Sequence, residues 1–261
     1  MIVVKFGGHA MKDENGNFAK AISAALATGE KVVVVHGGGP QIDAALKAKQ
    51  INSNWIGGFR VTTQEIFDVV EEVLVEQVGQ EVAATLGRSG IKAKAISART
   101  LPTVIARRRS TLIDGTPADL GFVGEVQSVN PAQLLELIEQ GYVPVVAPVS
   151  SDEDLKTGLN VNADFAAASI AAALEASQLI VMTDVAGIYR NWPDATTLID
   201  AISASDLESI KAGFAEGMAP KVQAALDALS YGAQAVRIID GTDPDSFASA
   251  LAGTGGTLVV A

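Results

Sequence analysis

The sequence has no cysteine and only two histidines among its 261 residues. Without cysteine, the chain can form neither disulfides nor thiolate metal sites, and it has no thiol nucleophile, which fits a reducing compartment. His9 and His36 each border a glycine turn without an acidic cluster beside them, so we interpret both as polar residues satisfied by the backbone. We therefore predict no metal ion that is held by the protein's own side chains.

Long apolar runs and an excess of basic residues are also missing. No stretch approaches the roughly 20 apolar residues that span a bilayer, and the first residues, MIVVKFGG, lack the segments of a signal peptide. A net charge of −11 opposes extended contact with nucleic-acid phosphates, and we interpret the basic cluster Arg107 to Arg109 as a solvated strand edge. We expect a cytoplasmic protein that binds neither membranes nor nucleic acid.

Several nucleotide-binding signatures are absent too. The Walker A ending G-K-[ST] occurs nowhere in the chain, and neither do the protein-kinase signatures H-R-D and D-F-G. The dinucleotide fingerprint G-x-G-x-x-G would need a third glycine where Ile42 stands. These absences disfavour P-loop enzymes, protein kinases and dinucleotide-dependent oxidoreductases.

A glycine turn at residues 31–43, with the sequence KVVVVHGGGPQID, is the most informative stretch that is present. Four valines in a row predict a buried parallel strand, and Pro40 suits the first turn of a following helix. Gly37, Gly38 and Gly39 then lie where the strand ends and the helix begins, so their backbone N–H groups can surround an anion. The simpler alternative is a sharp turn of the kind that any α/β protein uses.

A second glycine turn follows the apolar strand Met1 to Phe6, at Gly7 and Gly8. Lys5 is unusual because a lysine within such a strand must either meet an anion or extend its amino group to water. Both interpretations remain open from the strand pattern alone.

The order of the predicted elements indicates the fold class. With 48% apolar and 19% charged residues, the chain can bury a large core. Strands and helices alternate, which predicts an α/β protein with a mainly parallel sheet. An apolar strand starts again at Leu179 to Thr183, so we place a domain boundary near residue 176, between domains 1–176 and 177–261.

The longest predicted helix runs from Gln64 to Leu86. Its apolar residues recur at three- and four-residue spacing, with glutamates on the opposite side. Its apolar stripe either packs on the sheet or forms a dimer surface. Hairpins predicted over residues 103–129 are placed to cover a small ligand.

Two polar segments further along the chain, at residues 160–164 and at Lys221, contain candidates for a site. Asn162 suits the N-cap of a helix from Phe165 to Leu174, whereas Asn160 and Asp164, four residues apart, could point toward one site. Lys221 opens another predicted helix, where the helix dipole disfavours a cation, so it is either functional or a surface lysine.

Six motifs in order along nearly the whole chain make it resemble the N-acetylglutamate kinases of the amino acid kinase family. They are Lys5-Phe6-Gly7-Gly8, His36-Gly37-Gly38-Gly39-Pro40, Gly58-Phe59-Arg60-Val61-Thr62, Asn160-Val161-Asn162-Ala163-Asp164, Thr183-Asp184-Val185-Ala186-Gly187 and Gly217-Met218-Ala219-Pro220-Lys221. The resemblance implies that ATP phosphorylates the side-chain carboxylate of N-acetyl-L-glutamate, the second step of arginine biosynthesis. It implies an open three-layer α/β/α sandwich with a mainly parallel central sheet. In this fold, domain 1–176 would bind the acyl amino acid and form a homodimer, and domain 177–261 would bind ATP.

The resemblance also implies roles for individual residues. Lys5 and Lys221 would neutralise charge on the moving phosphoryl group, and Asp164 would orient both lysines. Gly8, Gly38 and Gly39 would hold the phosphoryl group and substrate through N–H groups, and Arg60 and Asn160 would hold the substrate's α-carboxylate and amide ends. Mg²⁺ would arrive with the nucleotide. The nucleotide contacts would be Gly7, Gly8, Thr183, Asp184, Val185, Ala186, Gly187, Ile188, Tyr189, Gly213, Phe214 and Ala215.

Two departures and three rivals accompany this resemblance. Thr63 stands where the family often has aspartate, and few residues precede Lys5, so we expect a dimer without the extra helix of hexameric, arginine-inhibited members. The rivals are a kinase of the same fold acting on carrier-linked aminoadipate or glutamate in lysine biosynthesis, a non-catalytic amino-acid-binding regulatory module, and the disfavoured oxidoreductase.

Overall fold

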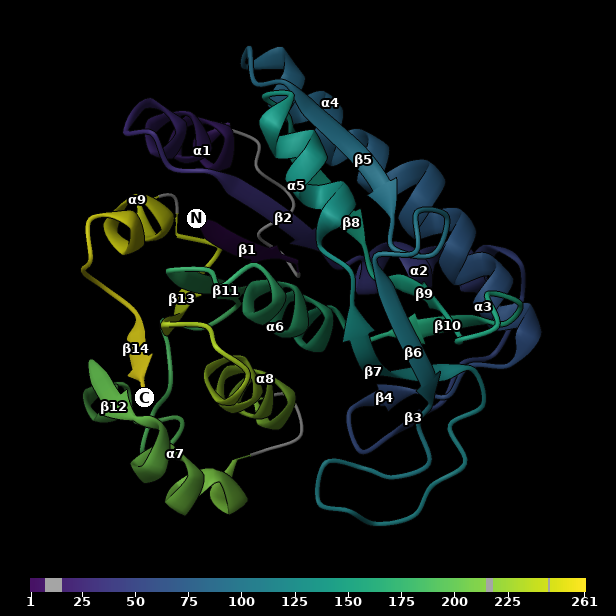
Figure 1. Ribbon diagram of the computed structural model, residues 1–261. Coiled ribbons are helices and arrows are strands. Elements are labelled where there is room, and N and C mark those ends of the chain that lie inside the picture. The colour runs from purple at the N-terminus through teal and green to yellow at the C-terminus, as the bar shows by residue number, and fades with distance from the viewer. Residues whose placement is uncertain (8–15, 215–217, 244) are drawn as a thin grey trace.

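A computed structural model describes residues 1–7, 16–214, 218–243 and 245–261. Its central sheet has eight strands in the order β12-β14-β13-β11-β1-β2-β8-β5 (Figure 1). Only β12, at one edge, and its neighbour β14 run opposite to the other strands, because β14 pairs antiparallel with β13 and parallel with β12. The prediction of a mainly parallel sheet is therefore confirmed. The strands are β1 (Ile2–Phe6), β2 (Val32–His36), β5 (Ala93–Ser97), β8 (Val143–Ala147), β11 (Gln178–Thr183), β12 (Ala201–Ser203), β13 (Ala235–Asp240) and β14 (Thr257–Val260).

Helices cover both faces of this sheet, which confirms the three-layer α/β/α sandwich (Figure 1). Successive side chains of a strand point to opposite faces, so Val3 of β1 joins one core and Val4 joins the other. One layer holds α5 (Ala132–Glu139), α6 (Ala163–Ala173), α7 (Ala204–Ile210) and α8 (Ala219–Ser230). The other holds α1 (Asn17–Ala27), α2 (Gly39–Ala48), α3 (Gln64–Glu71), α4 (Gly79–Arg88) and α9 (Ser246–Leu251).

The long predicted helix is present, but it changes its winding in the middle. Between α3 and α4, residues Glu72–Val78 form a π-helix. The apolar stripe along all three segments is buried against the sheet, so the outer side of this helix is mostly polar. The wider π turn brings Leu74 against the glycine turn after β2, because a Cβ atom on Gly38 would lie 2.6 Å from Leu74 Cδ2.

A small closed barrel lies beside the carboxyl end of β8. It consists of β6 (Val104–Arg108), β7 (Val123–Val129), β9 (Val149–Ser151) and β10 (Gly158–Val161), and a separate hairpin, β3 (Trp55–Ile56) and β4 (Phe59–Arg60), lies next to it (Figure 1). The predicted strand at 103–113 therefore ends early, at Arg108. Two 3₁₀ turns, η3 (Ala195–Thr197) and η4 (Lys211–Gly213), complete the described elements.

The length and polarity of the described helices bear on membrane insertion. None of them is both long and apolar enough to cross a bilayer.

Candidate active site

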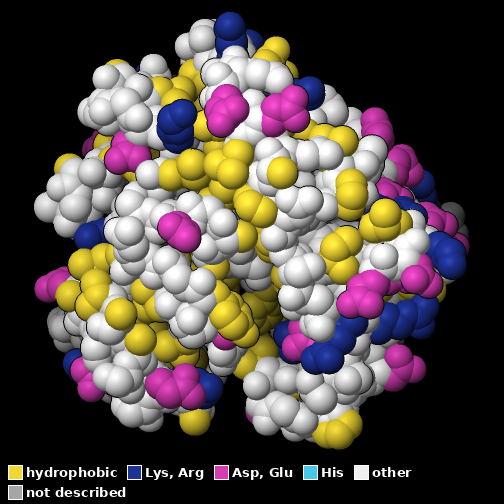
Figure 2. Space-filling view, viewed as in Figure 1, with side chains coloured by type: hydrophobic (Ala, Val, Ile, Leu, Met, Phe, Trp, Pro, Cys, Tyr) yellow, Lys and Arg dark blue, Asp and Glu magenta, His cyan; other side chains and the backbone are white. Residues whose placement is uncertain are grey.

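A cavity of about 590 Å³ lies where β1, the start of α2, the β3–β4 hairpin and the first turns of α6 and α8 meet. On the surface, the face shown in Figure 2 is hollowed below its centre, and hydrophobic side chains form the floor of this hollow. The sequence assigned eight residues to phosphoryl transfer and substrate binding, of which Gly8 lies outside the described residues. The other seven line the cavity: Lys5, Gly38, Gly39, Arg60, Asn160, Asp164 and Lys221.

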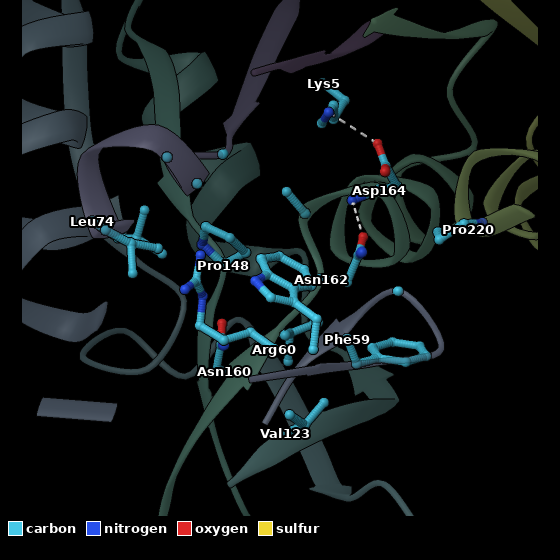
Figure 3. A pocket seen from close by; sticks show the side chains of 18 of the residues that line it. Lys5, Phe59, Arg60, Leu74, Val123, Pro148, Asn160, Asn162, Asp164 and Pro220 are labelled. Atoms are coloured by element: carbon cyan, nitrogen blue, oxygen red, sulfur yellow. Dashed lines mark hydrogen bonds and ion pairs between the residues drawn. The ribbon is translucent and has the colours of Figure 1, made fainter. Parts of the chain in front are cut away.

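Two lysines from opposite ends of the chain meet at one buried carboxylate. Lys5 Nζ lies 3.1 Å from Asp164 Oδ1, and Lys221 Nζ lies 3.5 Å from Asp164 Oδ2. Figure 3 shows Lys5 and Asp164 pointing toward one another at one end of the cavity, with Arg60 and Asn160 farther along it. The three groups together carry one net positive charge at the cavity wall.

Asp164 stays ionised because of these neighbours. Asp164 is only 4% exposed, and this burial by itself would raise the pKa of its carboxyl group. The charges and hydrogen bonds of Lys5 and Lys221 outweigh burial, so the pKa lies below its ordinary value. The carboxylate therefore holds both ammonium groups at neutral pH.

Local sequence explains how α6 presents Asp164. Asn162 is the N-cap, as predicted, and its side-chain oxygen accepts a hydrogen bond of 2.8 Å from the backbone N–H of Asp164. Lys221 lies in the first turn of α8, directly after Pro220, which suits a helix start. Both helix beginnings thus bring their polar side chains to the same cavity.

The glycine turn between β2 and α2 forms another part of the wall. Gly37 N–H donates to the carbonyl of Phe6 over 2.8 Å, which joins this turn to the end of β1. Gly38 is the N-cap of α2, so the positive end of that helix dipole faces the cavity. Leu74 occupies the space that a side chain at Gly38 would need, which explains the glycine there.

His36 is fully buried below this turn. Its Nδ1 lies 2.9 Å from the carbonyl oxygen of Gly37, and because a carbonyl only accepts, Nδ1 carries the proton. Its Nε2 is buried and has no hydrogen-bond partner among the described residues. Burial lowers the pKa of His36 from 6.5 to about 4, so the ring is neutral at pH 7.

Arg60 is held at the far end of the cavity by the hairpin. Its Nη1 donates to Ser53 Oγ over 2.8 Å and lies 2.7 Å from Asp43 Oδ1, and its guanidinium carbon lies 4.6 Å from the ring centroid of Trp55. Its Nη2 is buried without a hydrogen-bond partner in the described part of the chain. A carboxylate ligand would supply the missing acceptor.

Asn160 is connected to Arg60 through Thr62. Asn160 Nδ2 donates to Thr62 Oγ1 over 3.2 Å, and that hydroxyl donates to the Arg60 carbonyl over 2.8 Å. The sequence did not single out Asp43, Trp55 or Thr62 for these positions. Thr62 belongs to a motif that was recognised, whereas nothing in the periodicity marks Trp55 or Asp43.

Those residues assigned to the nucleotide that the structure describes are not part of the cavity wall. Thr183 ends β11, which pairs with β1 next to Lys5, and Asp184 beyond it is exposed. Ile188 is fully buried, and its N–H donates to Thr257 Oγ1 over 2.8 Å. Gly8, His9 and Ala215 lie outside the described residues. The others extend this edge of the sheet or follow α7: Gly7, Val185, Ala186, Gly187, Tyr189, Gly213 and Phe214.

Comparisons with known proteins agree with the fold. The sequence model of the amino acid kinase family matches residues 1–240. An acetylglutamate kinase from Beutenbergia cavernae is 43% identical over 247 residues, which cover 94% of this chain and 79% of that protein. The solved structure of smu.665 from Streptococcus mutans UA159 is 28% identical with a TM-score of 0.84, and the match covers 99% of this chain and 98% of that one. Carbamate kinase from Giardia lamblia bound to AMP-PNP is similar in fold, with 18% identity, a TM-score of 0.69 and coverage of 99% and 97%.

Proposed function

The chain belongs to the amino acid kinase family, and from this premise we propose that Lys5, Asp164 and Lys221 carry out its phosphoryl transfer. The reaction is the ATP-dependent phosphorylation of the side-chain carboxylate of N-acetyl-L-glutamate, in arginine biosynthesis, as the name of its 43% identical relative indicates. The products are N-acetyl-L-glutamyl 5-phosphate and ADP.

The cavity supports one orientation of the acyl amino acid. The α-carboxylate pairs with Arg60, whose Nη2 otherwise lacks a hydrogen-bond partner among the described residues. The amide end of the substrate hydrogen-bonds Asn160, which Thr62 holds in place. The side-chain carboxylate then points along the cavity toward Gly38, Gly39 and Lys5.

The transfer needs positioned charge more than a proton acceptor. An oxygen of the substrate carboxylate attacks the γ-phosphorus, while the bond to the oxygen that bridges the β- and γ-phosphates breaks and ADP leaves. Negative charge spreads over the three equatorial oxygens in the transition state, where Lys5, Lys221 and the N–H groups of the glycine turn stabilise it. The attacking carboxylate is already deprotonated, so the site requires no general base.

We assign ATP to the carboxyl edge of β11 and to the segment before α8, within residues 177–261, and the acyl amino acid to residues 1–176. This division is supported by the cavity wall, which comes from the first part of the chain except for Pro220 and Lys221. Lys221 is therefore the group that the nucleotide part contributes to the transfer.

Mg²⁺ fits as a companion of the nucleotide. The described residues contain no group of three or more His, Cys, Asp or Glu side chains that could hold a metal. The phosphate oxygens would accordingly be its principal ligands, and when bound it would neutralise part of their charge. We also propose that the protein acts in the cytoplasm as a homodimer through the Gln64–Leu86 helix, whose outer side is free of the core. Light scattering that gives a monomer would contradict the dimer.

The meeting of Lys5 and Lys221 on the two oxygens of Asp164 is the observation that carries this function. A coupled ADP-release assay should show activity with N-acetylglutamate well above that with glutamate or N-acetylaminoadipate. Lys5→Ala and Lys221→Ala should each lower turnover by about 10² to 10³, with far smaller changes in substrate binding. Lys156→Ala is the control, because that side chain is 79% exposed and far from the cavity wall. Near-normal turnover in either test variant would contradict the assigned roles.

A further inference from the structure

Arg109, just after β6, connects the substrate hairpin with the start of α6. Its guanidinium carbon lies 4.8 Å from the ring centroid of Phe59 and 5.4 Å from that of Phe165. Phe59 directly precedes Arg60, and Phe165 directly follows Asp164. One cation thus contacts the chain neighbours of two residues at opposite ends of the cavity. The rings also face each other, with centroids 6.3 Å apart and planes 15° apart.

The surroundings of Arg109 differ from those of the two arginines before it. Its side chain is 11% exposed, whereas that of Arg107 is 66% exposed, although both lie near Glu125. Arg109 Nη1 donates to the Thr111 carbonyl over 3.2 Å, and its Nη2 lies 3.6 Å from Glu125 Oε1. Its Nε is buried without a hydrogen-bond partner among the described residues.

A buried guanidinium with so few hydrogen bonds depends on other stabilisation. Burial lowers the pKa of Arg109, while the charges of Glu125 and Asp227 act in the opposite direction. The aromatic faces attract the cation as well, and this attraction grows when water is excluded. The two ring contacts therefore hold Arg109 in place, and Arg109 in turn holds the two rings.

Phe59 and Phe165 differ in how firmly their neighbours are fixed by other contacts. Asp164 is already held by Lys5, Lys221 and the N-cap Asn162. Arg60 lies on a strand of only two residues, Phe59–Arg60, next to a turn that contains Gly57 and Gly58. Loss of the Arg109 contacts should therefore move the hairpin and Arg60 more than it moves Asp164.

We propose that Arg109 is a positioning residue: by stacking on Phe59 and Phe165 it fixes Arg60 against the α-carboxylate of the acyl amino acid. The inference rests on the proposed function, because it assumes that Arg60 binds this carboxylate. Arg109 itself is not one of the residues that line the cavity, whereas Phe59 is.

The test compares three variants of the full chain by steady-state kinetics. Arg109→Met keeps the length and removes the charge, Arg109→Lys keeps the charge and removes the planar group, and Arg107→Met is the control that also loses a Glu125 contact. We expect the KM for N-acetylglutamate to rise about tenfold in both Arg109 variants. Arg109→Met loses both cation–π contacts, and Arg109→Lys loses the planar group that can stack on two rings at once. The KM for ATP and kcat should change less than about twofold, and Arg107→Met should match the parent.

A spectroscopic measurement makes the test independent of turnover. Trp55 stacks on Arg60, and Trp192→Phe leaves Trp55 as the sole tryptophan of the chain. In that background, both Arg109 variants should change the Trp55 emission, and Arg107→Met should not. If Arg109→Met fails to fold, Arg109→Lys decides the question by the same two measurements.

The possible failures can be told apart. An inactive parent with N-acetylglutamate would refute the proposed function, whereas the emission measurement would still report on the hairpin. An active parent with Arg109→Lys unchanged in both KM and emission would overturn the positioning role. A fall in kcat with an unchanged KM would also overturn it, since that result would indicate loss of catalytic rather than substrate-binding geometry.

Discussion

Acid should destabilise this protein through His36 once the pH falls below about 6.5. The ring is fully buried, and its Nδ1 proton is donated to the Gly37 carbonyl. A second proton would have to go to Nε2, which has no acceptor among the described residues. The folded protein therefore resists protonation, with a pKa of about 4 against 6.5 in the unfolded chain.

The sign and size of the effect follow from proton linkage. Above pH 6.5 the ring is neutral in both states and costs nothing. Below pH 6.5 the unfolded chain binds the extra proton, so stability falls until the pH reaches the folded pKa of about 4. At 1.36 kcal/mol per pKa unit, the full loss is about 3 kcal/mol, and about 2 kcal/mol is already lost at pH 5.

Urea unfolding at pH 7, 6 and 5, followed by circular dichroism, measures this loss. His36→Gln keeps a side-chain N–H that can donate to Gly37 but does not titrate. Whatever its own stability, the variant should lose about 2 kcal/mol less than the parent between pH 7 and pH 5. Asp164 does not contribute in this range, because its pKa lies below the ordinary carboxyl value. Parallel stability curves for the parent and the variant would refute the reasoning about Nε2.

Two further predictions concern the cavity and its support. Asp164→Asn leaves Lys5 and Lys221 without their shared carboxylate, so turnover should fall at least about 100-fold. Because the variant's site carries one more net positive charge, ATP should stabilise it more than the parent in thermal-shift measurements. An equal shift in both proteins would contradict this role of the Asp164 charge. Gly121→Ala should lower the free energy of unfolding in urea by about 2 kcal/mol or more. Gly121 has a φ of 68°, and an added Cβ would lie 2.3 Å from the Thr62 carbonyl oxygen. A decrease below about 0.5 kcal/mol would contradict this prediction.

Local patterns were sufficient where one element determines the outcome. The valines of β2, the glycines after it and the N-cap Asn162 each follow from preferences that act within a few residues. The parallel order of the strands also follows from their alternation with helices. The strand pattern alone could not predict the partner of Lys5, because it allowed either water or an anion. Only the fold shows that this partner is Asp164.

The features that the sequence did not reveal depend on contacts between distant segments. The π turn at Glu72–Val78 contains Leu74, which packs against Gly38, and the periodicity of the helix does not predict this turn. The short elements β10, β12 and α9 have too few residues for a recognisable pattern. The prediction of a solvated edge at Arg107 to Arg109 is correct for Arg107, whose side chain is exposed. The side chain of Arg109 points inward instead, because it packs on the rings of Phe59 and Phe165 from other segments.

The sheet order itself explains why a lysine in a buried strand can be functional. β1 lies between β2 and β11. The strands β2 and β8 follow on one side of β1, and β11 and β13 follow on the other, so the order of the strands reverses at β1. Neighbouring loops diverge at such a switch point, so the carboxyl end of β1 opens into a crevice. Lys5 is the last residue but one of that strand, and the Gly37 N–H bond to Phe6 keeps the adjoining glycine turn beside it. Lys5 can therefore contact Asp164 and line the cavity at the same time.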